Sequence, residues 1–209
     1  MAIEVYDFEQ RSTEWFIACL GNPGGSGIGR ILTSKGQPSA QRELYLNQLA
    51  YDRYTGKPTH SEFVSGHMTH GTENEDSARA LFELITGLDV TIPGVVFKDE
   101  RRLCHYSPDG LIGNHAILEI KNPMAKTHVK YLEQQKIPTQ YILQCQMGLY
   151  VCERDKVYFM SNCDGFAPLI IEQGRDEELI KKIHIAIEEF GTDLLARAEL
   201  FREQNGMPF

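Results

Sequence analysis

Apolar and polar positions follow two different periods along the chain, and the changes of period divide it into three parts. Helical spacing dominates the first part, alternating and β-branched apolar residues dominate the second, and helical spacing returns in the third. The predicted helices cover 11–20, a segment that opens near Ser26, 39–55, 67–86, 139–151 and 176–204. The predicted strands lie in LDVTIPGVVF, RLCHY, DGLIG, HAILEIK, KVYFMSN and PLIIEQ.

This order of elements predicts an α/β (α+β) fold with a mixed central sheet flanked by helices. We expect a single domain with a helical N-terminal part over about 1–87, a sheet-rich core over about 88–173 and a C-terminal helix over about 175–205. The apolar stripe of the last helix includes Ile183 and Phe190, and it is predicted to lie in the core or at a subunit contact.

One predicted hairpin, SPDGLIGNHAILEIKNP, places charged residues among apolar ones. Because strand side chains alternate between faces, Glu119 and Lys121 share one face of their strand. Asp109 follows a Ser-Pro turn, in the strand that would pair with it. The hairpin therefore predicts that the three side chains lie together.

Two interpretations of this group are open. An exposed Glu–Lys pair is common on strands and contributes only about 0–1 kcal/mol. Alternatively, the spacing Asp-x9-Glu-x-Lys matches the pattern of metal-dependent nucleases, in which carboxylates hold hard cations and a lysine orients the attacking water. Such cations stabilise the negative charge that gathers in a phosphodiester transition state.

A further acidic candidate lies in the helix GTENEDSARALFEL. On a helical wheel Glu75 falls about 20° from Phe82 in the apolar stripe, whereas Glu73 faces the opposite side. A buried carboxylate needs a cation. Arg79, one turn further on, and the predicted metal site are equally good candidates for that cation.

The apolar helix predicted over 139–151 carries polar residues on one face. Tyr141, Gln144 and Gly148 share this face. The amide of Gln144 either satisfies a buried backbone group, as core amides usually do, or hydrogen-bonds a phosphate oxygen.

Composition narrows the class of protein without selecting one. The 209 residues are 42% hydrophobic and 24% charged, and their net charge is −8 at pH 7. This acidic total argues against nonspecific coating of nucleic acid, but it permits an enzyme that gathers basic groups in one channel. The chain has no apolar run long enough to span a membrane and no signal-peptide pattern at its N-terminus. Five cysteines without a CxxC pair predict reduced thiols and a cytoplasmic protein.

In order and spacing, several motifs resemble the lambda-type, or YqaJ-type, viral recombinase and alkaline exonuclease family. They are EWFIACLG with the later Ser26, GTENEDSARALFEL, SPDG, LEIKNP and YILQCQ. The resemblance covers most of the chain and implies a restriction-endonuclease-like (PD-(D/E)XK) core. It also implies a 5′-to-3′ exonuclease that degrades one strand of linear double-stranded DNA to mononucleotides and leaves a 3′ overhang. The implied cofactor is Mg²⁺, as two ions, with Mn²⁺ as a substitute.

The implied partners are double-stranded DNA ends, further copies of the chain in a homotrimeric ring, and a single-strand annealing protein, in a bacterial host of a phage or prophage. Residue by residue, the resemblance makes Asp109, Glu119 and Glu75 metal ligands, the carbonyl of Ile120 a backbone ligand and Lys121 the water-activating lysine. The implied phosphate and DNA contacts are Ser26, Arg30, Ser107, Gln144 and Tyr141.

Cys19 departs from the family pattern, which usually has arginine at this position to hold the terminal phosphate. A thiol cannot supply a bidentate cationic fork. Either Arg30 replaces that arginine, or the enzyme discriminates less between 5′-phosphate and 5′-hydroxyl ends. We predict reduced discrimination.

Three other functions would suit parts of this sequence. They are a related endonuclease, a repair nuclease of the iron–sulfur type and a catalytically inactive DNA-end-binding module. Wide cysteine spacings speak against the second, and the intact Asp109, Glu119 and Lys121 speak against the third. A DNA channel also requires that basic residues gather toward the DNA. Those named for this role are Lys35, Arg42, Arg53, Arg101 and Arg102.

Overall fold

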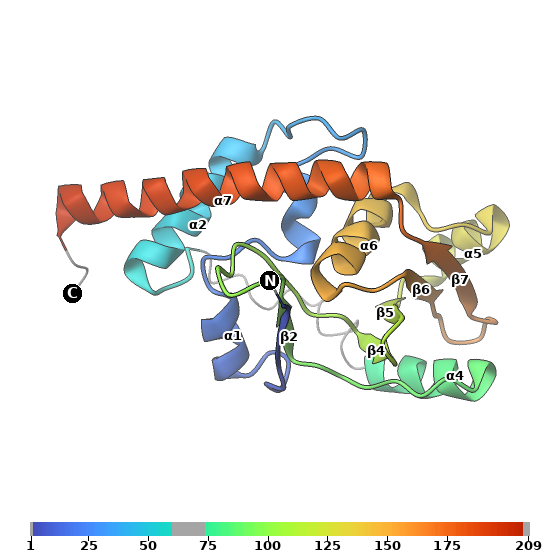
Figure 1. Ribbon diagram of the computed structural model, residues 1–209. Helices are drawn as coiled ribbons and strands as arrows, with labels where there is room; N and C mark the ends of the chain where they lie inside the picture. The colour runs from blue at the N-terminus through green and yellow to red at the C-terminus, as the bar shows by residue number, and fades with distance from the viewer. Residues whose placement is uncertain (1, 60–73, 207–209) are drawn as a thin grey trace.

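The computed structural model describes residues 2–59 and 74–206 (Figure 1). Its helices are α1 (Thr13–Cys19), the 3-10 helix η1 (Gly25–Arg30), α2 (Arg42–Thr55), α4 (Glu75–Thr86), α5 (Ala125–Gln134), α6 (Thr139–Cys152) and α7 (Glu177–Asn205). Its strands are β1 (Glu4–Tyr6), β2 (Val95–Phe97), β3 (His105–Tyr106), β4 (Gly110–Ile112), β5 (Ala116–Lys121), β6 (Lys156–Ser161) and β7 (Leu169–Gly174).

A mixed four-stranded sheet forms the centre of the fold, in the order β4-β5-β6-β7. Strands β5 and β6 run parallel, and the other neighbours are antiparallel. Parallel strands need a crossover connection, which α5 and α6 supply. Helix α6 packs on β5 and β6, and α4 also contacts β5. The predicted mixed sheet flanked by helices is thus confirmed.

A second, antiparallel sheet has the order β1-β2-β3. Strands β2 and β3 were expected to belong to the central sheet, but they pair with each other and with β1 instead. Strand β1 and helix α5 were not predicted. The first has only three residues and pairs with a distant segment, and the second buries only His128 and Tyr131, too few to give an apolar stripe.

The two faces of β5 explain how the core is divided. Ile117 lies in a large apolar cluster with residues of α2, α6 and α7. Ala116, Leu118 and Ile120 lie in a smaller cluster with Phe82 of α4. Both faces of the strand are therefore covered, and the predicted alternation of its side chains is confirmed.

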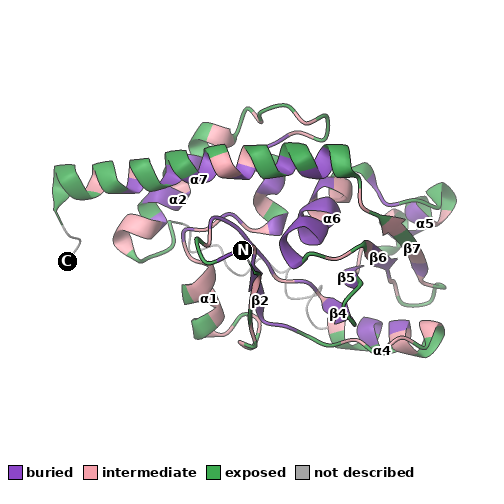
Figure 2. Cartoon of the chain, viewed as in Figure 1, coloured by how far each residue is buried: buried purple, intermediate pink, exposed green. Residues whose placement is uncertain are grey.

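Helix α6 lies in the interior, and α7 lies over it at the surface (Figures 1 and 2). Helix α7 has 29 residues, or ~43 Å of helix. The carboxylate of Asp176 caps it by accepting from the Leu179 backbone N–H at 3.0 Å. Ile183 and Phe190 are fully buried, so the predicted stripe is confirmed as part of the core.

Helix boundaries agree with the pattern except near their starts. Helix α2 begins at Arg42, a few residues later than predicted, and the segment near Ser26 is a 3-10 helix. Helix α4 is described from Glu75 to Thr86, and the earlier part of its predicted span lies outside the described residues. Among the described helices, none is long and apolar enough to cross a membrane.

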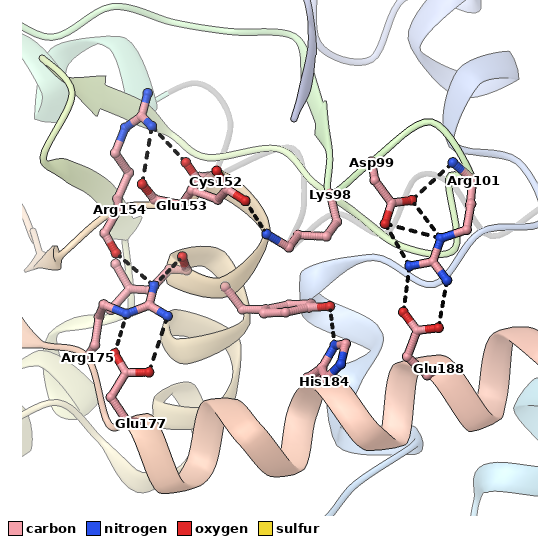
Figure 3. Close-up of polar contacts among 12 residues, drawn as sticks. Lys98, Asp99, Arg101, Cys152, Glu153, Arg154, Arg175, Glu177, His184 and Glu188 are labelled. Carbon is pink, nitrogen blue, oxygen red and sulfur yellow. Dashed lines mark hydrogen bonds and ion pairs between the residues drawn. The ribbon is translucent and has the colours of Figure 1, made fainter. Parts of the chain in front are cut away.

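The C-terminal end of α6 is surrounded by ion pairs (Figure 3). Arg175 donates to the carbonyl of Leu149 at 2.9 Å and pairs with Glu177 at 2.6 Å. The nearby partners join this end of α6 to the β2–β3 connection and to α7. We refer to these ion-pairing residues as the peripheral ion-pair cluster. They are Lys98, Asp99, Arg101, Glu153, Arg175, Glu177 and Glu188.

Candidate active site

The β4–β5 hairpin brings the acidic residues of the site together. Gly110 pairs with Leu118, so Asp109 lies next to Glu119 across the two strands. The Oδ2 atom of Asp109 accepts a hydrogen bond from the backbone N–H of Ile120 at 2.5 Å. The hairpin prediction is therefore confirmed in its geometry.

Glu119 is only 2% exposed, which rules out the interpretation as a surface Glu–Lys pair. Its Oε1 accepts from the Lys121 ammonium and, at 2.6 Å, from the Gln144 amide of α6. Its Oε2 accepts from the Tyr106 hydroxyl at 2.5 Å. The carboxylate is thus held by donors from β3, β5 and α6. We call Asp109, Glu119, Lys121 and Glu75 the carboxylate site.

Burial and the Glu119 charge together raise the pKa of Asp109 well above its usual range. Burial alone would lower the pKa of Lys121, but the neighbouring Glu119 and Asp109 carboxylates outweigh it and raise that pKa. Lys121 is therefore an ammonium ion, and a further cation bound beside the two carboxyl groups would offset the cost of burying their negative charges together.

The donor atoms suit a hard divalent cation in kind. Two carboxylates and the Ile120 carbonyl offer only oxygen, which Mg²⁺ prefers. Within 2–59 and 74–206, no three His, Cys, Asp or Glu side chains gather closely enough to hold a metal. The candidate site has only two such side chains, and its third oxygen comes from a backbone carbonyl, so it falls below that number. Asp109 and Glu119, with the carbonyl of Ile120, are the residues that would hold the ion.

Glu75 begins α4, and its side chain is 13% exposed. It pairs with Arg79 at 3.4 Å, the local partner considered from the sequence, and with Arg11 at 2.9 Å. Arg79 also donates through Nε to the Asp109 carbonyl at 2.9 Å. Glu75 is thus linked to the hairpin through Arg79, and Glu73 lies outside the described residues.

A YqaJ-like viral recombinase domain model matches residues 14–155. This range contains β4, β5, α6 and every member of the carboxylate site. The chain belongs to the YqaJ-like viral recombinase family.

Solved structures agree with this family. An alkaline exonuclease, LHK-Exo from Laribacter hongkongensis, superposes with a TM-score of 0.83 at 29% identity, covering 92% of this chain and 97% of the other. LHK-Exo in complex with dAMP gives the same TM-score and coverage at 30% identity. A phage-related exonuclease from Haemophilus somnus 129PT shares the fold, with a TM-score of 0.59 at 13% identity over 96% of this chain and 98% of the other. No match is found among curated proteins.

The restriction-endonuclease-like fold expected for the family is confirmed by these neighbours. The predicted phosphate contacts lie on three parts of the fold: Ser107 precedes β4, Tyr141 and Gln144 belong to α6, and Ser26 and Arg30 belong to η1. Ser107 precedes Asp109 by two residues, and its hydroxyl accepts from the Trp15 indole N–H at 2.9 Å. Ser26 is exposed on η1. Ser107 is therefore within the same hairpin as the carboxylates, with α1 packed against it.

Helix α6 directs three residues of one face toward the site, as its sequence predicts. Gln144 contacts Glu119, and the ring of Tyr141 lies 5.2 Å from the Lys121 ammonium. Gly148 faces the ring of Tyr106. In this structure Gln144 orients the Glu119 carboxylate, and its role toward phosphate stays a prediction.

Arg30, the proposed replacement for the missing family arginine, contacts α2. Its guanidinium lies 4.0 Å from the centre of the Tyr45 ring and donates to the Gln48 side chain at 2.9 Å. Burial raises the pKa of the Cys19 thiol to about 12, so Cys19 is neutral. The neutral thiol contributes no positive charge for a terminal phosphate.

Most of the basic residues named for a DNA channel are engaged within the chain. Arg42 pairs with Asp193, Arg101 with Glu188 and Arg102 with Glu4. Arg53 donates to the Gly21 carbonyl. Their charges are partly compensated at short range, so these residues give weaker support to a DNA channel than their number suggests.

Sequence reasoning did not single out Tyr106. Its only local signal is its place directly before Ser107-Pro108-Asp109. Its contact with Glu119 depends on three elements meeting in the fold.

Proposed function

We propose that this chain is a Mg²⁺-dependent 5′-to-3′ exonuclease that degrades one strand of linear duplex DNA to mononucleotides and leaves a 3′ overhang. The family and its structural neighbours support a nuclease role in recombination. The observation that carries the proposal is the buried Glu119, held beside Asp109 by Lys121 and Gln144. Two buried carboxylates with an ammonium group suit a reaction in which negative charge develops on phosphate.

The reaction is hydrolysis of the first phosphodiester bond. Water adds to phosphorus, the bond from phosphorus to the 3′ oxygen of the terminal nucleotide breaks, and that oxygen takes a proton. The phosphate stays on the next nucleotide, which becomes the new 5′ end. Bound Mg²⁺ would supply charge stabilisation and an activated water.

Lys121 has a positioning and electrostatic role in this proposal. Because its pKa is raised by Glu119 and Asp109, it donates hydrogen bonds and does not remove a proton at neutral pH. It orients the attacking water or a phosphoryl oxygen over the carboxylates. Asp109, Glu119 and the Ile120 carbonyl would hold the cation, and Glu75, linked to the hairpin through Arg79, would add negative charge from α4.

We further propose the partners that suit this activity: double-stranded DNA ends, a homotrimeric ring and a single-strand annealing protein, in the cytoplasm of a phage host. A related endonuclease is the second candidate, because it would use the same carboxylates. The iron–sulfur alternative is weakened, since all five cysteines are described and the described residues hold no three-residue metal group.

Lys121→Ala tests the proposal against a matched lysine of the same sheet. Lys156 also pairs with a glutamate, Glu172, but at the start of β6, where both side chains are partly exposed. Linear duplex, nicked circle, closed circle and single-stranded DNA are incubated with Mg²⁺ and each variant. Loss of the linear duplex alone, abolished by Lys121→Ala and retained by Lys156→Ala, is expected. Cutting of closed circles would favour the endonuclease, and binding without cleavage would favour the inactive module.

Cys19→Arg tests the departure from the family pattern. The wild-type protein is expected to degrade 5′-hydroxyl and 5′-phosphate duplexes at similar rates, because Cys19 is neutral and Arg30 is engaged with α2. The variant is expected to favour the phosphorylated end. Rates on the two substrates measure the ratio directly, and a strong preference in the wild-type protein would contradict the prediction.

A further inference from the structure

Tyr106 is a buried residue that joins the second sheet to the carboxylate site. It ends β3 and is 1% exposed, and its hydroxyl donates to Oε2 of Glu119 at 2.5 Å. A phenol in the core normally needs a hydrogen-bond partner. Here the partner is a residue that the proposed function makes a metal ligand.

The ring of Tyr106 occupies a space that two glycines leave open. A Cβ at Gly25 of η1 would lie 2.2 Å from Cε2 of the ring, and a Cβ at Gly148 of α6 would lie 2.7 Å from Cζ. Real Cβ atoms do not approach other atoms this closely, so neither position admits a side chain while the ring keeps its place. We call this space the glycine slot. It fixes the direction of the Tyr106 hydroxyl.

The hydrogen bonds of Glu119 show what a fixed hydroxyl does. An ionised carboxylate has about four lone-pair sites. Lys121 and Gln144 donate to Oε1, and Tyr106 is the donor on Oε2. Three of the sites are thus filled by protein groups, and one remains on Oε2. Without the tyrosine hydroxyl, these protein donors would contact only Oε1, and the plane of the carboxylate would be held through that one oxygen.

We propose that Tyr106 is a positioning residue, which orients the Glu119 carboxylate so that its remaining lone pair faces the divalent cation. The inference rests on the proposed function. It assigns the tyrosine no contact with DNA or with the reacting atoms. Groups that orient metal ligands typically change metal affinity or activity by about 10-fold to 100-fold when they are removed.

Tyr106→Phe removes the hydroxyl and keeps the ring in the glycine slot. Tyr150→Phe is the matched control, because Tyr150, near the C-terminal end of α6, is also largely buried and its hydroxyl bonds to His184 of α7. Titration calorimetry with Mg²⁺ and with Mn²⁺, without DNA, measures metal affinity. Steady-state cleavage of a linear duplex separates kcat from KM, and thermal unfolding reports folding.

We expect Tyr106→Phe to weaken Mg²⁺ binding by about 10-fold and to lower kcat, with KM for DNA unchanged and partial rescue at high Mg²⁺. Tyr150→Phe should leave Mg²⁺ binding and kcat unchanged, although it should lose about as much thermal stability as Tyr106→Phe. Tyr106→Phe binding and cleaving within twofold of the wild type would overturn the inference, as would a wild-type protein that binds neither ion. If the wild type binds Mg²⁺ but cleaves no DNA, the proposed function fails, while weaker binding by Tyr106→Phe would still support the positioning role.

Discussion

Helix α6 contacts two groups of charged residues in very different surroundings, the carboxylate site through Gln144 and the peripheral ion-pair cluster at its C-terminal end (Figure 3). In the carboxylate site Glu119, whose side chain is 3% exposed, bonds to Lys121. In the peripheral ion-pair cluster Arg175 pairs with Glu177, whose side chain is 70% exposed. The second pair lies near the surface and its two charges match, whereas the first is buried beside another carboxylate, Asp109.

This difference separates the proposed catalytic site from a cluster that connects neighbouring elements of the fold. In the peripheral ion-pair cluster each cation meets a carboxylate, and Arg175 also bonds to the carbonyls of Leu149 and Arg154. A cavity of about 480 Å³ lies there, and four of its lining residues form two ion pairs, Lys98 with Glu153 and Arg175 with Glu177. At the carboxylate site like charges are buried together, which raises the pKa of Asp109. Burial of like charges, more than the number of charges, distinguishes the proposed site from the peripheral cluster.

Asp109→Asn should give the largest difference between the carboxylate site and the peripheral ion-pair cluster. Cleavage is expected to fall by about 10³-fold or more, equal to about 4 kcal/mol. The free energy of unfolding of the metal-free protein should stay equal or rise, because a carboxyl that repels Glu119 is removed. Cleavage rates and urea unfolding check both. Glu177→Gln in the peripheral cluster is the control, and a parallel loss of stability and activity in Asp109→Asn would contradict the comparison.

His105→Gln should change how stability depends on pH. Burial lowers the pKa of His105 to about 4, whereas an unfolded histidine titrates near about 6.5. Keeping His105 neutral therefore contributes to the free energy of unfolding in full above about pH 6.5. This contribution, about 3 kcal/mol in all, is lost as pH falls toward about 4. The variant should show a flatter slope of unfolding free energy across that range. Equal slopes in urea titrations at pH 7, 6 and 5 would sink this prediction.

Arg175→Gln should weaken the fold without touching chemistry. The substitution removes the charged donor from the Leu149 and Arg154 carbonyls, at a cost of about 2 kcal/mol. The cleavage rate per folded molecule should stay within twofold. Unfolding and cleavage are measured on the same preparation. A large fall in kcat would mean that the peripheral ion-pair cluster does influence the carboxylate site.

Glu188→Gln should have the smallest effect. Glu188 bonds to Arg101, which lowers the pKa of the carboxyl. Such an exposed pair contributes about 0–1 kcal/mol, present above the ordinary pKa of the carboxyl and lost as pH falls through its lowered value. The cost of the variant should therefore vanish in acid and shrink at high salt. An unchanged cost at 1 M salt would show that the contribution is not ionic.

Local periodicity was enough to predict the hairpin and the polar face of α6. Asp109, Glu119 and Gln144 could be placed because strand alternation and helical spacing act over a few residues. Helical spacing also placed Glu75 in the apolar stripe, but it did not decide whether Arg79 or the predicted metal site supplies the cation that Glu75 needs.

Contacts between distant segments were not predictable in this way. The pairing of Arg11 with Glu75 joins residues 64 positions apart, and Arg11 has a left-handed φ of 71° that no sequence pattern signals. The Tyr106–Glu119 bond also depends on Gly25 and Gly148, which no periodic pattern connects. What the sequence lacked was the relative placement of η1, β3 and α6.

The glycine slot constrains the order in which this protein can accept amino-acid substitutions during evolution. While the tyrosine is present, alanine at either glycine position collides with its ring, so the tyrosine must become smaller before a glycine can become larger. Gly25→Ala should therefore be harmful in the wild-type background and nearly neutral after Tyr106→Ser. Family members with a small residue in place of the tyrosine are expected to carry alanine or serine at the position of Gly25 more often than members that keep it. A Cβ at Gly148 would also lie 2.6 Å from Cδ1 of Ile117, so that position stays closed, and Gly25 and Tyr106 would be inherited as a pair although they belong to separate elements.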